Sequence, residues 1–182
     1  MNIQHTVVWQ RRDQPGTEYF VLSQVDEIIQ LRGDVIVALN GLPVAVQYTI
    51  RCDGSWRTRE VLVREQLGTE ERTLHLTVLD QQWLKGGQAL DELRGCSDVD
   101  LGVTPSTNTL PIRRLNLSVG QAVDITAAWV RFPELTVEPS LQRYTRLSEN
   151  SYRYESLSYQ ADLIVDELGV VQRYADVWER VA

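Results

Sequence analysis

Two aspartates, Asp98 and Asp100, have the types and spacing that most directly suggest chemistry in this sequence. In an extended segment, residues two apart lie on the same face of the chain. Two carboxylates on one face could act as acid and base in glycoside hydrolysis, or could accept hydrogen bonds from sugar hydroxyls. They could also pair with Arg113 and Arg114 and hold the segment closed. The residues favour this structural pairing, while ligand contact and catalysis stay open as alternatives.

Arg113 and Arg114 follow a proline in the run Leu-Pro-Ile-Arg-Arg. Adjacent residues of a strand point to opposite faces, so one of the two arginines is expected to face any cavity. A guanidinium at a cavity mouth could bind an anionic head group through forked hydrogen bonds. Thr107 and Asn108 would add neutral hydrogen bonds, although such residues commonly satisfy their own backbone.

Several aromatic residues lie in segments with the character of strands. These are Trp129, Tyr144, Tyr152 and Tyr154. On a concave sheet their rings could line a groove for an acyl chain or a sugar, because an aromatic ring combines apolar area with a polar edge. The alternative is that they are ordinary core residues.

Other catalytic or metal-dependent chemistry finds no support in the sequence. His5 and His75 stand alone, whereas a metal site needs several convergent ligands. Cys96 has no nearby histidine to activate it, and Cys52 is far from it in sequence, so both are expected to be buried thiols. We therefore expect no metal, no cofactor and no catalytic residue, and a binding protein is favoured over an enzyme.

Composition narrows the partners further. The 182 residues carry a net charge of −7 and are 43% apolar. Nucleic-acid binding and attachment to an anionic membrane both need clustered positive charge, so neither is expected. The chain shows no signal-peptide pattern and no apolar run of roughly 20 residues, the length that spans a bilayer. A cytoplasmic location follows as an expectation.

The elements that must position these residues are mostly strands. Apolar residues alternate with polar ones through most of the chain, as in residues 73–78. Asn40-Gly41 predicts a tight hairpin turn, and further turns are predicted at Asp53-Gly54 and at residues 67–70. We predict a mainly β protein with at least 40% strand. Helix is predicted only at residues 88–93 and in the last few residues.

An internal repeat is suggested when the sequence is shifted by 96 residues. Residues 43–61 then align with residues 139–157, and Tyr48 falls on Tyr144. We predict that these two segments are equivalent strand–turn–strand units. The chain is expected to form a single domain, residues 1–182, with repeats at about 33–85 and 120–180.

The segment between these repeats carries a family resemblance. GCSDVDLGVTPSTNTLPIRRL, residues 95–115, resembles the signature of a bacterial family known as putative glycolipid-binding proteins, formerly a domain of unknown function. The similarity extends over residues 18–181 and includes VDELGVVQRYADVWERV at residues 165–181. One departure is the turn before Trp83, where a glycine is expected. The resemblance implies a curved antiparallel sheet, a half-barrel like those of bacterial lipoprotein carriers.

Three functional hypotheses remain. In the first, the concave face of the sheet binds the tail of an amphiphilic, glycolipid-like molecule and residues 98–114 contact its head group. In the second, the same face pairs with a second subunit in a homodimer and takes no ligand, because an open apolar face must be covered. In the third, Asp98 and Asp100 act in a glycoside or ester hydrolase.

Overall fold

The computed structural model describes residues 3–157 and 159–182, which together form one sheet of fifteen strands. Strand accounts for 63% of the described residues and helix for 7%, so the prediction of a mainly β protein is confirmed. The first arm of the sheet contains β1 (Ile3–Arg11), β2 (Gly16–Val25), β3 (Ile28–Leu39), β4 (Leu42–Cys52), β5 (Thr58–Leu67), β6 (Glu70–Leu79), β7 (Gln82–Lys85) and β8 (Gln88–Ala89).

The second arm follows a connecting segment that holds the helices. These are η1 (Asp91–Leu93), η2 (Ser106–Asn108) and α1 (Thr109–Leu115). The strands of the second arm are β9 (Asp98–Leu101), β10 (Ala122–Arg131), β11 (Thr136–Arg146), β12 (Ser151–Ser156), β13 (Tyr159–Val165), β14 (Val171–Tyr174) and β15 (Trp178–Arg180).

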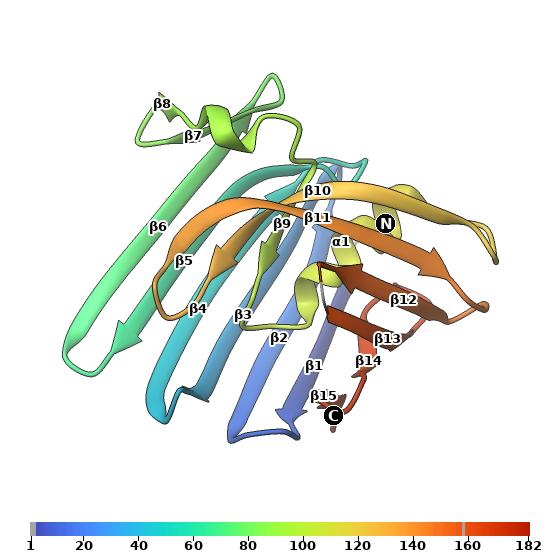
Figure 1. The fold of residues 1–182 in the computed structure, drawn as a ribbon, viewed down its shortest axis with the longest axis horizontal. Helices are drawn as coiled ribbons and strands as arrows, with labels where there is room; N and C mark the ends of the chain where they lie inside the picture. The colour runs from blue at the N-terminus through green and yellow to red at the C-terminus, as the bar shows by residue number, and fades with distance from the viewer. Residues whose placement is uncertain (1–2, 158) are drawn as a thin grey trace.

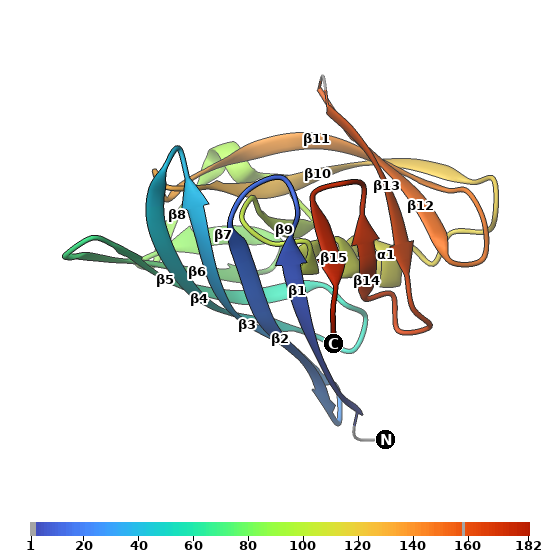
Figure 2. The ribbon, with the colours of Figure 1, turned by 90° about the horizontal axis from the view of Figure 1, so that it is seen from below.

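The two arms are antiparallel meanders that join where β1 pairs with β15. β9 is the exception, because it runs parallel to β10 at the end of the sheet. The sheet is curved and stays open. Figures 1 and 2 show that β10 and β11 cross over the face of β1–β6, with β9 and α1 between the two layers. Among the described residues, no helix combines the length and the apolar character needed to cross a bilayer.

The turns form where the sequence predicts them. Asn40 and Gly41 connect β3 to β4 with φ angles of 52° and 79°, the positive values that a two-residue type I′ turn requires. The segments at residues 53–57 and 68–69 likewise connect antiparallel neighbours. At the departure from the family pattern, Asp80 and Gln81 adopt φ angles of 49° and 66°. The turn before Trp83 therefore keeps a conformation that favours glycine without having one.

Helix is the part of the prediction that was wrong. Residues 88–93 contain only the short strand β8 and one 3₁₀ turn, and the C-terminal residues form β15. The α-helix lies instead at Thr109–Leu115, within the segment read as extended. Pro111 is compatible with it because the residue lies in the first turn, where backbone N–H groups have no helical partner anyway. Asn116 ends the helix in the left-handed conformation, with φ of 45°.

The local structures of the two segments are consistent with the proposed repeat. Residues 43–61 span β4, a turn and part of β5, and residues 139–157 span part of β11, a turn and β12. Both are antiparallel strand–turn–strand units. The connecting turn has five residues in the first unit, 53–57, and four in the second, 147–150. Duplication of the chain stays a prediction.

A substitution at Gly33 tests how tightly the side chains of the first arm are packed. It lies opposite Tyr48, and a Cβ at this position would lie on the Tyr48 ring. Gly33→Ala should therefore lower the free energy of unfolding by roughly 1–3 kcal/mol, the usual cost of overpacking, as measured by urea denaturation. Gly54→Ala is the control, because its Cβ would meet its nearest neighbour at an ordinary 3.6 Å. Equal costs for the two variants would contradict this packing.

Candidate functional site

Residues 104–109 form a buried polar segment between the two arms, here called the polar plug. Its sequence is Thr-Pro-Ser-Thr-Asn-Thr, and its polar side chains are at most 8% exposed. A buried hydroxyl or amide without a partner costs free energy, so the contacts of these side chains determine how the segment is held. Those contacts reach both arms of the sheet.

On the first arm, the polar plug meets Tyr48 and Glu18. The Tyr48 hydroxyl donates to the Glu18 carboxyl group at 2.5 Å and lies 2.6 Å from the Ser106 hydroxyl. Thr104 donates to Ser106 at 3.0 Å. Glu18 is fully buried, and this burial raises its pKa to about 8, so the side chain is neutral at neutral pH.

On the second arm, the polar plug meets Asp100, Gln142 and Tyr144. The Asp100 carboxyl group accepts hydrogen bonds from the Thr107 hydroxyl at 3.2 Å and from the Gln142 amide at 2.7 Å. Burial raises the pKa of Asp100. The Tyr144 hydroxyl donates to the Asn108 side-chain oxygen at 2.9 Å. The polar plug therefore connects the two layers through side chains from each.

Asp98 belongs to a separate cluster, which contains the structural ion pair that the sequence favours. The Arg114 guanidinium donates to the two carboxylate oxygens of Asp98 at 2.9 and 2.6 Å, and Ser97 donates to the same carboxylate at 2.8 Å. Asp98 is 1% exposed. Nearby, burial raises the pKa of Cys52 to about 12 and that of Cys96 to about 11, so both buried thiols stay protonated at neutral pH.

The predicted network of two aspartates and two arginines is thus divided. Asp98 pairs with Arg114, whereas Asp100 has only neutral partners and Arg113 lies elsewhere. Arg113 and Arg114 also belong to α1, so the reason given for their separation was wrong. On a helix, adjacent side chains diverge by about 100°, from 3.6 residues per turn, which sends the two arginines to different surroundings.

The predicted aromatic residues lie on the concave face but reach different surroundings. Trp129 and Tyr154 line a groove of about 480 Å³ between residues 100–108 and the second arm. The groove is named here the aromatic groove, after its rings, which belong to Trp129, Tyr154, Tyr159, Tyr174 and Trp178. Asp100 and Asn108 also line it. Tyr144 is 3% exposed and packs edge-on against Tyr154, with ring centroids 5.4 Å apart.

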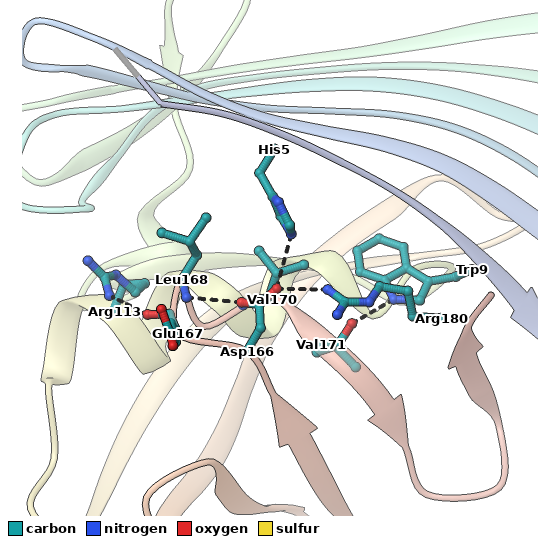
Figure 3. Close-up of polar contacts among 9 residues, drawn as sticks. All are labelled: His5, Trp9, Arg113, Asp166, Glu167, Leu168, Val170, Val171 and Arg180. Carbon is teal, nitrogen blue, oxygen red and sulfur yellow. Dashed lines mark hydrogen bonds and ion pairs between the residues drawn. The ribbon is translucent and has the colours of Figure 1, made fainter. Parts of the chain in front are cut away.

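Tyr152 and Arg113 face a second hollow, of about 850 Å³, named here the arginine hollow after Arg113, Arg146 and Arg180. Part of it is drawn in Figure 3, where His5 and Arg180 converge on Asp166 and Arg113 reaches the backbone of Glu167. The two hollows have volumes typical of small-molecule sites. Across the part of the chain that the structure describes, no three His, Cys, Asp or Glu side chains converge as metal ligands.

The site also contains residues that the sequence analysis missed. Glu18 and Tyr48 anchor the polar plug, and Gln142 binds Asp100. Glu18 could have been noticed from the sequence, because it lies two residues before Phe20 and four before Leu22 on β2. The three side chains therefore share the buried face of the strand. A carboxyl group at such a position requires a buried partner. The identity of that partner, 30 residues away in sequence, has no local signal.

The raised pKa of Glu18 predicts a pH-dependent stability. The unfolded chain releases this proton near the ordinary carboxyl pKa of 4.5, whereas the folded protein holds it up to about 8. The Glu18 contribution to the free energy of unfolding should therefore fall as pH rises from about 4.5 to 8, by up to about 1.4 kcal/mol per pH unit. Glu18→Gln should remove this slope in urea denaturation at pH 5 and pH 8. An unchanged slope in the variant would show that Glu18 is already ionised in the folded protein.

The Asp98–Arg114 pair predicts a large loss of stability on mutation. Asp98→Asn would leave the Arg114 guanidinium, whose side chain is 15% exposed, without its carboxylate. The expected cost is about 3–5 kcal/mol, as for breaking a buried ion pair. Asp162→Asn breaks an exposed pair with the same forked geometry to Arg153, at 2.8 and 3.1 Å, and should barely shift the melting temperature. Similar shifts in melting temperature for the two variants would contradict the prediction that the buried ion pair contributes more to stability than the exposed one.

Comparison with known proteins identifies relatives of the chain. Residues 6–180 match the model of a family described as "Putative glycolipid-binding". The fold is similar to that in the 1.80 Å crystal structure of a DUF1089 family protein from Pseudomonas aeruginosa. The TM-score is 0.83 and the sequence identity 34%, over 91% of this chain and 92% of that chain. No curated protein sequence matches the chain.

Proposed function

Because the chain belongs to the family described as putative glycolipid-binding, we propose that it binds an amphiphilic, glycolipid-like molecule in the aromatic groove and does not transform it. The observation that carries this proposal is the gathering of five aromatic rings around one groove whose lining also includes polar side chains, among them Asp100 and Asn108. Aromatic faces provide apolar area, and Asp100 and Asn108 provide the oriented polar contacts that a head group needs.

The rings have the arrangement that such a ligand requires. Tyr159 and Tyr174 stack with centroids 6.3 Å apart and an interplanar angle of 12°, and Tyr154 contacts both. Tyr159 is 44% exposed and Trp129 is half-buried, so both rings are partly accessible, with the Arg131 guanidinium 5.2 Å from the centre of the Trp129 ring. We place the ligand in this groove rather than over the whole concave face, because the polar plug fills the centre of that face.

The roles of the predicted ligand residues differ under this proposal. Asp100, Asn108, Trp129 and Tyr154 line the aromatic groove and are proposed to contact the ligand. A second group is proposed to hold the wall of the groove in place through the contacts described above; its members are Thr107, Arg114 and Tyr144. Arg113 and Tyr152 face the arginine hollow. Catalysis is not favoured, because the Asp98 carboxylate is taken up by Arg114 and Ser97 instead of facing Asp100.

We propose a cytoplasmic location for this binding protein. Two buried cysteines without a disulfide, Cys52 and Cys96, support it. Thiols are kept reduced in the cytoplasm, whereas disulfides form in secreted proteins. A homodimer would offer another way to cover the groove, since Leu157 at its edge is 97% exposed.

Titration calorimetry with octyl glucoside, an uncharged amphiphile used below its micelle concentration, tests the proposal. Tyr159→Ala should weaken binding roughly five- to tenfold, because it removes one stacked ring. Tyr19→Ala is the control, since this tyrosine is 46% exposed on β2 and lies outside the groove. It should bind like the wild type.

Native mass spectrometry of freshly purified protein distinguishes the ligand from a partner. A co-purifying amphiphile that is reduced in Tyr159→Ala supports the proposal. A dimer without a ligand, together with no octyl glucoside binding, would contradict it and favour the interaction module. Hydrolysis of the glucoside that is lost in Asp100→Asn would show an enzyme instead.

A further inference from the structure

The arginine hollow lies on the same concave face as the aromatic groove, at the opposite ends of the same strands. Residues two apart on a strand share a face. Four strands each place one residue in the arginine hollow and a second residue, on the same face of the strand, in the aromatic groove. The pairs are His5 and Arg11 on β1, Tyr152 and Tyr154 on β12, Gln172 and Tyr174 on β14, and Arg180 and Trp178 on β15.

Asp166 is the carboxylate at the centre of the arginine hollow, and its oxygens are fully occupied. One oxygen accepts from His5 at 3.0 Å and from Arg180 at 2.8 Å (Figure 3). The other accepts from the backbone N–H groups of Leu168 and Val170, each at 3.0 Å. Four donors on one carboxylate leave it little capacity to bind a further cation.

Arg146 is a cation of the hollow that is held without a carboxylate. Its guanidinium donates to the backbone carbonyls of Leu117, Ser148 and Glu149 at 2.8, 3.1 and 2.6 Å. It also lies 5.6 Å from the centre of the Tyr152 ring. Among the described residues it makes no ion pair, so its position is fixed by neutral groups.

Arg113 is the second such cation, and it is more accessible. Its guanidinium lies over the Trp56 ring at 5.3 Å, and its one polar contact is a long one, 3.5 Å to the Glu167 carbonyl oxygen. It too has no carboxylate partner within the described part of the chain. The side chains of Glu149 and Glu167 also line the hollow, but both residues are exposed, so solvent screens their charges.

We propose that the arginine hollow is a second binding site, separate from the aromatic groove, for a phosphate-type oxyanion held by Arg113 and Arg146. Guanidinium groups donate forked hydrogen bonds to phosphate oxygens. Each of the two arginines has N–H groups beyond those used in the contacts above, and the amides of Asn116 and Gln172 supply neutral donors on the same wall. The hollow thus offers donors from α1, β11 and β14 to one anion.

Titration calorimetry with inorganic phosphate tests this site in the full-length protein. Arg113→Gln should weaken phosphate binding at least about tenfold, the equivalent of losing one charge-assisted hydrogen bond. Arg113→Lys keeps the charge but loses the fork, and should give an intermediate affinity. Melting temperatures of both variants should stay close to that of the wild type, because Arg113 is exposed and has no ion pair in the described structure.

Arg173→Gln is the matched control. Arg173 is exposed on β14 next to Gln172, so its side chain points to the opposite face, and the mutation removes the same charge. It should change phosphate affinity by less than about twofold, since its exposed charge points away from the hollow and is screened by solvent and salt. Equal weakening in Arg113→Gln and Arg173→Gln, or no phosphate binding at millimolar concentration, would overturn the proposal.

The source of the phosphate group is distinguished by titrating octyl phosphate in parallel. Tighter binding of octyl phosphate than of inorganic phosphate, lost in Arg113→Gln, identifies the head group of a lipid. Equal affinities identify a small polar phosphate. Octyl glucoside carries no charge and reports on the aromatic groove alone, so the two sites can fail independently.

Discussion

The fold depends on a polar segment buried between two layers of one open sheet. The sheet is curved and open, and residues 104–109 lie between its two layers with hydrogen bonds to each. Ser106 is bonded to Tyr48 on the first arm, and Thr107 is bonded to Asp100 on the second. Because a buried polar group without a partner is costly, either arm can move only by breaking these bonds.

Two of the buried carboxyl groups at or near the polar plug avoid an unpaired charge, whereas Asp100 has, among the described residues, only the neutral partners Thr107 and Gln142. Glu18 is kept neutral by its raised pKa, and the Asp98 charge is matched by Arg114. These are two different solutions to the cost of burying a carboxyl group. The first makes stability depend on pH, and the second makes it depend on one arginine of α1. The polar plug therefore fixes the relative position of the arms through hydrogen bonds to each.

A feature of this fold or site could be predicted from the sequence when the residues that form it are close together in the sequence. Strands and turns are local, so period two and Asn40-Gly41 predicted them correctly, and the 95–115 motif predicted the family. The polar plug is not local: Tyr48 meets Ser106 58 residues later in the sequence. The helix α1 was missed because Arg113 and Arg114, which follow a proline, were read as strand residues, although proline is tolerated in a first helical turn. Residue types predicted a network of two aspartates and two arginines, and the described part of the structure contains only the Asp98–Arg114 pair of it.

The solid centre of the concave face also determines where ligands can bind. Between the two hollows, Trp9 and Val171 are fully buried, and the Trp9 indole donates to the Val171 carbonyl oxygen at 2.7 Å. The two hollows are separate cavities on either side of this contact. Each hollow therefore has to select its ligand with the side chains at its own end of the strands. Five aromatic rings line one hollow and three arginines line the other, so one face of a single sheet presents two chemically different sites.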